Sequence, residues 1–249
     1  LHSLEKSLRC PLFKNEGRNL IPLKSAYVLE ENSKKIVQDI VTTVNKTREA
    51  AGFASKVFHL GSLYSLTVNT IPSVISGLKL RRGDLDIQLS LSSNLDLVKK
   101  LKATELDAII VALNETTSGQ EFEHLPMFED DIFLAVNKDS KYVGWDEIDL
   151  SQLKDETFLT LKKGFATRND SDFVFEKAGI NPKVFLQVSD IFTLISMVSS
   201  GVGLALLPGR ISTIYESSVK LIRLKAQYQI KQQIGLVFLK SKERDPNLL

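Results

Sequence analysis

The apolar positions at the start of the chain recur at helical spacing and then stop. Leucines at intervals of three to four residues predict one apolar face of a helix, with Leu1, Leu4, Leu8 and Leu12 as its members. A short basic loop around Gly17 and an extended pair at 20–21 follow, and Pro22 precedes a second helix expected to open at about 24–26. The pattern therefore predicts a helix, a hairpin and another helix.

A long amphipathic helix is predicted over about 25–48, a stretch without glycine or proline. Its apolar face consists of Leu29, Ile36, Val37, Ile40, Val41 and Val44, and its charged side of Glu30, Glu31, Lys34, Lys35, Asp39 and Lys46. With no obvious packing partner in its own chain, this face is expected to pair with a second copy; the alternative is a helix packed on its own domain. Residues 51–55 are the expected hinge out of this helix.

Beyond the hinge, strand-like and helix-like patterns alternate. The predicted strands cover 57–61, 85–91, 108–113, 129–137, 158–161, 184–188, 203–207 and 234–239. The predicted helices run from Pro72 to about Leu80, over 95–102, over 173–178 up to Gly179, and over 191–200 up to Gly201. Such alternation predicts an α/β fold with mostly parallel sheets and crossover helices.

Composition narrows the class of protein only a little. The chain has 249 residues and a net charge of +2, which is too mild to indicate nucleic-acid binding by itself. No apolar run is long enough for a membrane span, and no signal-peptide pattern opens the chain. The single cysteine, Cys10, excludes an internal disulfide, and the three histidines lack the spacing of metal ligands, so they are read as structural or surface residues.

The first segment resembles the second half of the winged helix-turn-helix of LysR-type transcriptional regulators. The resemblance rests on Leu4-Glu5, Leu12-Phe13, Arg18 and the stretch 23–27. The chain departs from the family pattern at Cys10-Pro11, at Lys24 in place of threonine and at Tyr27 in place of glycine. The resemblance implies that the preceding helices of the unit lie upstream of Leu1, so the chain is expected to be a fragment or to lack its front end.

What the resemblance implies for this segment is contact with double-stranded DNA. Its expected DNA-binding residues are Lys6, Lys14, Asn15 and Arg18, with the last three in the wing against phosphate or the minor groove. The alternative is that this cluster of basic residues is an ordinary solvent-exposed surface. By the same resemblance, 1–24 is the end of the DNA-binding domain and 25–52 is a linker helix that pairs two subunits.

The remainder, 55–249, resembles the effector-binding domain of the same family. The matching pieces are Gly61, 71–72, 106–109, 178–182 and above all 201–208. The implied fold is two α/β subdomains joined by two crossover strands, like a periplasmic solute-binding protein. Subdomain I is expected over about 55–127 and 233–249, and subdomain II over about 128–232.

Three corners after predicted strands are expected to face an effector cleft, because ligands in α/β folds bind beyond the carboxyl ends of strands. Ser65 lies where family members place a ligand-contacting serine or threonine, and Asn94, or Ser93 if the register slips by one, aligns with a second polar contact. Each of these sites suits a helix N-cap at least as well.

The third corner contains Thr167 and Arg168, and Ser189 lies on a loop expected to line the entrance of the same cleft. The run 165–168 and the residues after it resemble the cyanate-responsive member of the family. Arginine at a helix N-terminus is electrostatically misplaced unless an anion offsets it, and its planar fork holds carboxylates well. The alternative is a surface ion pair of Arg168 with Asp170 or Asp172.

No pattern supports catalysis, a cofactor or a metal. Phosphate loops, serine elbows and paired metal ligands are lacking, and the pairs Asp130-Asp131 and Glu121/Glu123 are interpreted as solvated charges near a crossover. The resemblance implies a cytoplasmic regulator that binds DNA and a small, anionic effector and associates as a dimer or tetramer. The alternative is a stand-alone solute receptor or enzyme of the same fold, which would have no use for a basic wing and a dimerising helix.

Overall fold

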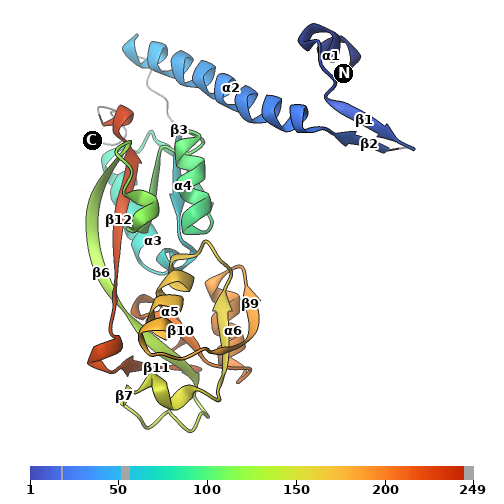
Figure 1. Cartoon of the computed structure of the whole chain (residues 1–249). Helices are drawn as coiled ribbons and strands as arrows, with labels where there is room; N and C mark the ends of the chain where they lie inside the picture. Colours follow the sequence, from blue (N-terminus) through green and yellow to red (C-terminus); the bar gives the residue numbers. More distant parts are fainter. Residues whose placement is uncertain (18, 52–56, 244–249) are drawn as a thin grey trace. The chain divides into compact units, whose positions relative to one another are not determined.

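The computed structural model describes residues 1–17, 19–51 and 57–243, and the chain divides into two compact units, 1–55 and 56–249. We refer to them as the N-terminal unit and the C-terminal unit and describe each by itself (Figure 1).

The N-terminal unit begins with the predicted helix, hairpin and helix. Helix α1 (His2–Leu8) precedes an antiparallel hairpin of β1 (Phe13–Glu16) and β2 (Asn19–Pro22), and α2 (Lys24–Ala50) follows. The first helix is shorter than the leucine pattern predicts, because Arg9 adopts a left-handed conformation that ends it. Leu12 is buried outside the helix, where the Glu5 carboxylate accepts hydrogen bonds from the backbone N–H groups of Leu12 and Phe13. These bonds lower the pKa of Glu5 and fix the corner between helix and hairpin.

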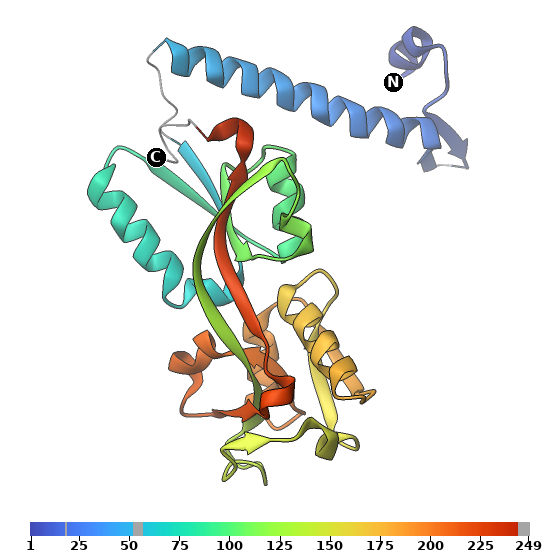
Figure 2. The ribbon, with the colours of Figure 1, turned by 60° about the vertical axis from the view of Figure 1, so that its left-hand side comes forward.

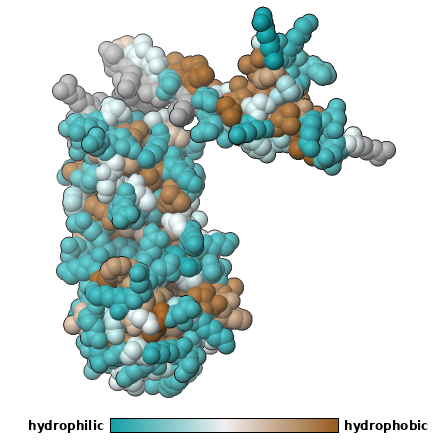
Figure 3. All heavy atoms as spheres, in the orientation of Figure 1, coloured by the Kyte–Doolittle hydropathy of each residue, from teal (hydrophilic) through white to brown (hydrophobic). Residues whose placement is uncertain are grey.

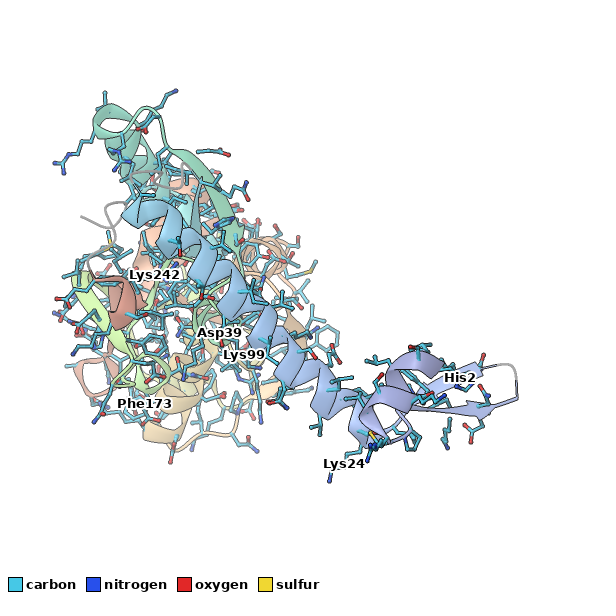
Figure 4. All side chains as sticks on the ribbon, turned by 90° about the horizontal axis from the view of Figure 1, so that it is seen from above. His2, Lys24, Asp39, Lys99, Phe173 and Lys242 are labelled. Carbon is cyan, nitrogen blue, oxygen red and sulfur yellow. The ribbon has the colours of Figure 1, made fainter. Side chains whose placement is uncertain are left out.

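Helix α2 confirms the predicted long amphipathic helix. Large apolar side chains are exposed within its unit, at Tyr27, Val28, Ile36, Val37, Ile40 and Val44. Figure 3 shows brown apolar residues among teal polar ones on this unit, and Figure 4 marks Lys24 at the helix start and Asp39 among its polar residues. Ala51 lies in a turn, and the rest of the expected hinge, 52–55, falls outside the described residues.

The C-terminal unit contains two lobes that share a pair of long strands. These strands, β6 (Phe122–Asn137) and β12 (Lys231–Leu239), run antiparallel and side by side through both lobes (Figure 2). In lobe 1 the strand order is β4-β3-β5-β12-β6, where β3 is Val57–Ser62, β4 is Asp86–Leu91 and β5 is Ala108–Ala112. Helices α3 (Thr70–Arg81) and α4 (Asn94–Lys102) cover this sheet, and Leu60, Leu97, Ile109 and Val237 lie in its core.

Lobe 2 is built around the other half of β6. Strands β10 (Ala205–Pro208) and β11 (Val219–Leu224) pair with β6, and the short β7 (Glu147–Ile148) pairs with β11. Strands β8 (Thr157–Leu161) and β9 (Lys183–Val188) pair in parallel beside them. Helices α5 (Ala166–Lys177), α6 (Ile191–Ser199) and α7 (Ser212–Tyr215) complete the lobe. Its two buried clusters centre on residues such as Phe158, Val174, Leu194 and Leu207.

The α/β class with two lobes and two crossover strands is confirmed, but three details of the expectation are wrong. The sheets are mixed, because β6 runs antiparallel to β10, β11 and β12, and β12 runs antiparallel to β5. The helix expected over 173–178 begins at Ala166, since the polar run 167–172 hides its apolar period. Strand β11 carries Lys220 and Arg223, which interrupt its apolar run, and it was not expected at all.

Candidate functional site

A narrow pocket lies between the two lobes of the C-terminal unit, at the carboxyl ends of β3, β4 and β8. The chain turns from these strands into short helix N-termini, so the pocket wall consists of helix starts. Its lining residues are Leu63, Tyr64, Ser65 and Ser92 from lobe 1 and Leu161, Phe165, Ala166, Thr167 and Ile191 from lobe 2. The cavity has apolar walls, few polar groups and a volume of only about 20 Å³, so it is almost closed in this arrangement of the lobes.

Two buried hydroxyl groups supply most of the polarity of this pocket. Thr167 is 6% exposed, and its side chain belongs to the pocket lining. Ser65 is 4% exposed, and its Oγ accepts a hydrogen bond from Arg210, which leaves the hydroxyl proton free to be donated. The first-turn N–H groups of α5, at Ala166 and Thr167, have no intrahelical acceptor. The pocket therefore presents donors to a ligand that accepts hydrogen bonds.

A contact between the lobes closes one side of the pocket. The backbone N–H of Leu95, in the first turn of α4, donates to the carbonyl oxygen of Gly164 at 3.1 Å. Gly164 has a φ of +98°, a conformation that side-chain-bearing residues rarely adopt, so the loop between β8 and α5 depends on glycine here. One first-turn N–H group of α4 therefore already has an acceptor in the protein, whereas the first-turn N–H groups of α5 are available as donors to a ligand.

Behind Ser65 lies a buried polar network centred on Arg210. Its Nε donates to Ser65 Oγ at 3.0 Å, its Nη1 to Asp130 Oδ2 at 3.0 Å and its Nη2 to Gln232 Oε1 at 2.5 Å. The backbone N–H of Arg210 also donates to Asp130 Oδ2 at 3.0 Å. Gln232 then donates through Nε2 to Asp170 on α5. The network therefore joins lobe 1, both crossover strands and the helix that carries Thr167.

Burial shifts the pKa values of two charged residues of this network, Asp170 and Arg210. Desolvation raises the pKa of Asp170 to about 6, against the lowering effects of the Gln232 hydrogen bond and the Arg210 charge. Desolvation lowers the pKa of Arg210, while Asp130 acts in the opposite direction. Arginine remains protonated in proteins, so Arg210 is a permanent buried cation. With Asp170 ionised, the network holds one positive and two negative charges.

Of the six residues predicted to bind an effector, Ser65 and Thr167 line the pocket. Ser93 is the N-cap of α4, where its Oγ accepts from the Asp96 backbone N–H at 3.2 Å. Asn94 is buried, accepts from the Ala112 backbone N–H at 3.0 Å and donates to Thr116 Oγ1 at 3.3 Å. These two side chains are occupied by structural bonds, and their contact with an effector stays a prediction.

Arg168 and Ser189 also lie outside the pocket lining. Arg168 Nε donates to both carboxylate oxygens of Asp172 at 2.8 Å, and its Nη1 donates to the Leu161 carbonyl at 3.1 Å. This is the ion pair that the sequence left open as the alternative. Ser189 is exposed, and Asp190 rather than Ser189 caps α6. A direct contact of either residue with an effector stays a prediction.

Sequence reasoning missed Arg210 and Gln232 and misread Asp130. Asp130 was interpreted as a solvated charge, but its side chain is 13% exposed and it pairs with Arg210. A signal was available, because Arg210 follows the buried strand β10 at its carboxyl end, the kind of position used to select the other corners. Gln232 gave no such signal, since it lies inside β12, 22 residues along the chain from Arg210.

The residues expected to contact DNA lie in the N-terminal unit. Lys6 is exposed on α1, and Lys14 and Asn15 are exposed on β1. Lys14 Nζ lies 3.3 Å from Glu16 Oε1, an exposed pair of little energetic weight. Arg18 falls outside the described residues. Across the described parts of the chain, histidine, cysteine and acidic side chains form no group of three or more able to hold a metal ion. The described helices include none with the length and apolar character of a membrane span.

Comparison with known proteins gives consistent results for both units. Residues 51–249 match the family model for the LysR substrate binding domain. The malonate utilization transcriptional regulator of Klebsiella pneumoniae is 41% identical over 254 residues, which cover 100% of this chain and 81% of that protein.

Two solved structures share the fold. Full-length CbnR complexed with its target DNA superimposes with a TM-score of 0.71 at 16% identity, over 99% of this chain and 84% of that one. The effector-binding domain of QuiR in complex with shikimate has a TM-score of 0.68 at 22% identity, over 77% of this chain and 90% of that one.

Proposed function

The chain belongs to the LysR family of transcriptional regulators, and from this premise we propose that the pocket at Ser65 and Thr167 binds a small anionic effector. The observation that carries the proposal is the set of donors at one narrow site: two buried hydroxyls and the first-turn N–H groups of α5. Donors of this kind, at the positive end of a helix dipole, favour a ligand with acceptor oxygens and negative charge.

A short carboxylate is the effector class that fits best. The relative from Klebsiella pneumoniae is named for malonate utilization, and malonate carries two carboxylates on a single carbon. The finer resemblance of 165–168 to the cyanate-responsive regulator makes cyanate a second anion to include in any test. The cavity volume is about 20 Å³, room for about one water molecule, so binding of malonate requires the two lobes to move apart from this arrangement.

Effector binding would act by changing the balance between arrangements of the two lobes. The pocket draws its walls from both lobes, so a ligand that bridges Ser65 and Thr167 has higher affinity for the closed arrangement than for an open one. That difference in affinity is what allows a small molecule to alter how paired subunits hold DNA.

The remaining assignments follow from the same proposal. Residues 1–24 end a DNA-binding domain, with Lys6, Lys14, Asn15 and Arg18 against DNA, and 25–52 link it to the effector-binding domain over 55–249. Within that domain, 55–127 with 233–249 and 128–232 are the two subdomains. The protein works in the cytoplasm as a dimer or tetramer.

Titration calorimetry with malonate, cyanate and acetate tests the effector site. Thr167→Val removes a buried hydroxyl while keeping the side-chain shape, and we expect malonate affinity to fall about tenfold, the value of a hydrogen bond to a charged group. Thr213→Val, on the exposed side of α7, is the matched control and should leave affinity unchanged. Equal affinity of the parent chain and the Thr167 variant for every anion would remove the proposal.

A further inference from the structure

Arg210 has a position that effector contact alone does not explain. It follows β10 in lobe 2, and among the described pocket-lining side chains its hydrogen bond goes to Ser65. Its guanidinium uses Nε, Nη1 and Nη2 on three different elements, namely η1 (Tyr64–Thr67), β6 and β12. A side chain that is 9% exposed and bound in this way is held in one orientation.

The direction of the hydrogen bonds in this network is fixed by chemistry. Arginine can only donate, so Ser65 Oγ and Gln232 Oε1 must both accept. With its oxygen facing Arg210, Gln232 must turn its amide nitrogen toward Asp170, which accepts. Ser65, having accepted from a cation, has its own proton left to donate.

Donation from a cation strengthens the next hydrogen bond in a chain. A hydroxyl that accepts from a guanidinium is polarised and becomes a better donor toward an anion. The Ser65 oxygen keeps a second lone pair after it accepts from Arg210, but the adjacent Arg210 charge disfavours a cationic donor and favours an anionic acceptor at this point. Arg210 therefore selects for acceptor groups on the ligand, and it does so through Ser65 and without contacting the ligand itself.

We propose that Arg210 is a positioning residue of the effector site, which orients Ser65 to donate to a carboxylate and links that contact to the crossover strands through Asp130 and Gln232. The inference rests on the proposed function of the pocket. It adds a specific claim, that Arg210 acts on the effector through Ser65 and makes no independent contribution to affinity.

A double-mutant cycle on malonate affinity tests this claim. Arg210→Lys keeps the charge but loses the planar fork, and Ser65→Ala removes the hydroxyl. We expect each single variant to weaken malonate binding about tenfold and the double variant to weaken it by about the same factor instead of a hundredfold. Arg223→Lys, an exposed arginine on β11, is the matched control and should bind like the parent chain.

A second pair of variants covers the case in which Arg210→Lys fails to fold. Arg210→Gln with Asp130→Asn removes the ion pair as a whole, so Asp130 is not left as a buried carboxylate without its partner. The cycle with Ser65→Ala is repeated in that background, after circular dichroism has shown native secondary structure. The same non-additivity is expected.

The outcomes separate the two proposals. Additive losses, or an Arg210→Lys variant with parental affinity, would overturn the role of Arg210 while the pocket assignment stands. A parent chain that binds neither malonate nor cyanate nor acetate would overturn the pocket assignment and the role of Arg210 with it.

Discussion

At the scale of single residues, Asp170 is unusual because its pKa is raised although a buried cation, Arg210, lies nearby. Its carboxylate faces Gln232, and the Arg210 charge lies beyond that amide, so the compensation it receives is indirect. Asp130 holds the direct contact with Arg210. Desolvation therefore prevails at Asp170 and raises its pKa to about 6.

This raised pKa predicts a pH-dependent stability. Between the ordinary pKa of 3.8 and about 6, folded chains bind more protons at Asp170 than unfolded chains do, so its contribution to stability is lost as pH rises through 6. Asp170→Asn should gain stability relative to the parent chain between pH 4 and pH 7.5, by up to about 3 kcal/mol. Urea denaturation at both pH values measures this, with the exposed Asp155→Asn as control. A pH-independent difference would contradict the assignment.

The residues of the site differ in how far sequence alone could identify them. Ser65 and Thr167 follow strands at corners that local pattern marks, and both line the pocket. Arg168 was favoured as a ligand contact because of its position between a strand and a helix, with Asp170 or Asp172 as the alternative partner, and the structure shows its pair with Asp172. The Arg210 network depends on contacts across 145, 80 and 22 residues of chain, and no local pattern reports those.

At the scale of elements, α2 was predictable because its pattern is long and uninterrupted, whereas α5 was not. The first two turns of α5 are mostly polar, and their side chains bond to Gln232 on β12 and to the Leu161 carbonyl on β8. Thr167 and Ser171 are buried there although neither is apolar. Tertiary surroundings thus set the start of this helix, and they are absent from a local sequence window.

The exposed apolar face of α2 predicts self-association. Ile36 and Val37 are each 60% exposed and Ile40 is 58% exposed, a stripe that is costly to leave in water. Ile40→Glu should weaken dimerisation at least tenfold, because the carboxylate would be buried between two helices. Glu31→Lys, on the opposite side of α2, should have little effect. Sedimentation equilibrium of both variants measures this, and an unchanged dimer in Ile40→Glu would exclude α2 as the interface.

At the scale of the whole molecule, the sequence predicted the order of units and the α/β class, and it failed on strand direction. Alternation of strands and helices favours parallel sheets, but two long strands pass between the lobes and return antiparallel. Strand β6 spans 16 residues, and the sequence marked only its second half, since the first half is mostly exposed. Passage between lobes, and not local propensity, determines the length of that strand.

The division into two units predicts that DNA affinity and effector affinity respond to different substitutions. Lys14 is exposed on the hairpin, and its weak pair with Glu16 leaves it available to a phosphate. Lys14→Ala should lower affinity similarly for all DNA sequences and reduce the slope of log affinity against log salt by about 1. Fluorescence anisotropy over a series of salt concentrations measures that slope, and calorimetry on the same variant should give parental malonate affinity.

Lys183→Ala, exposed on β9 in the C-terminal unit, is the matched control. An unchanged slope in Lys14→Ala would place the phosphate contacts elsewhere, because a lysine that neutralises a phosphate cannot be removed without changing the number of counterions released.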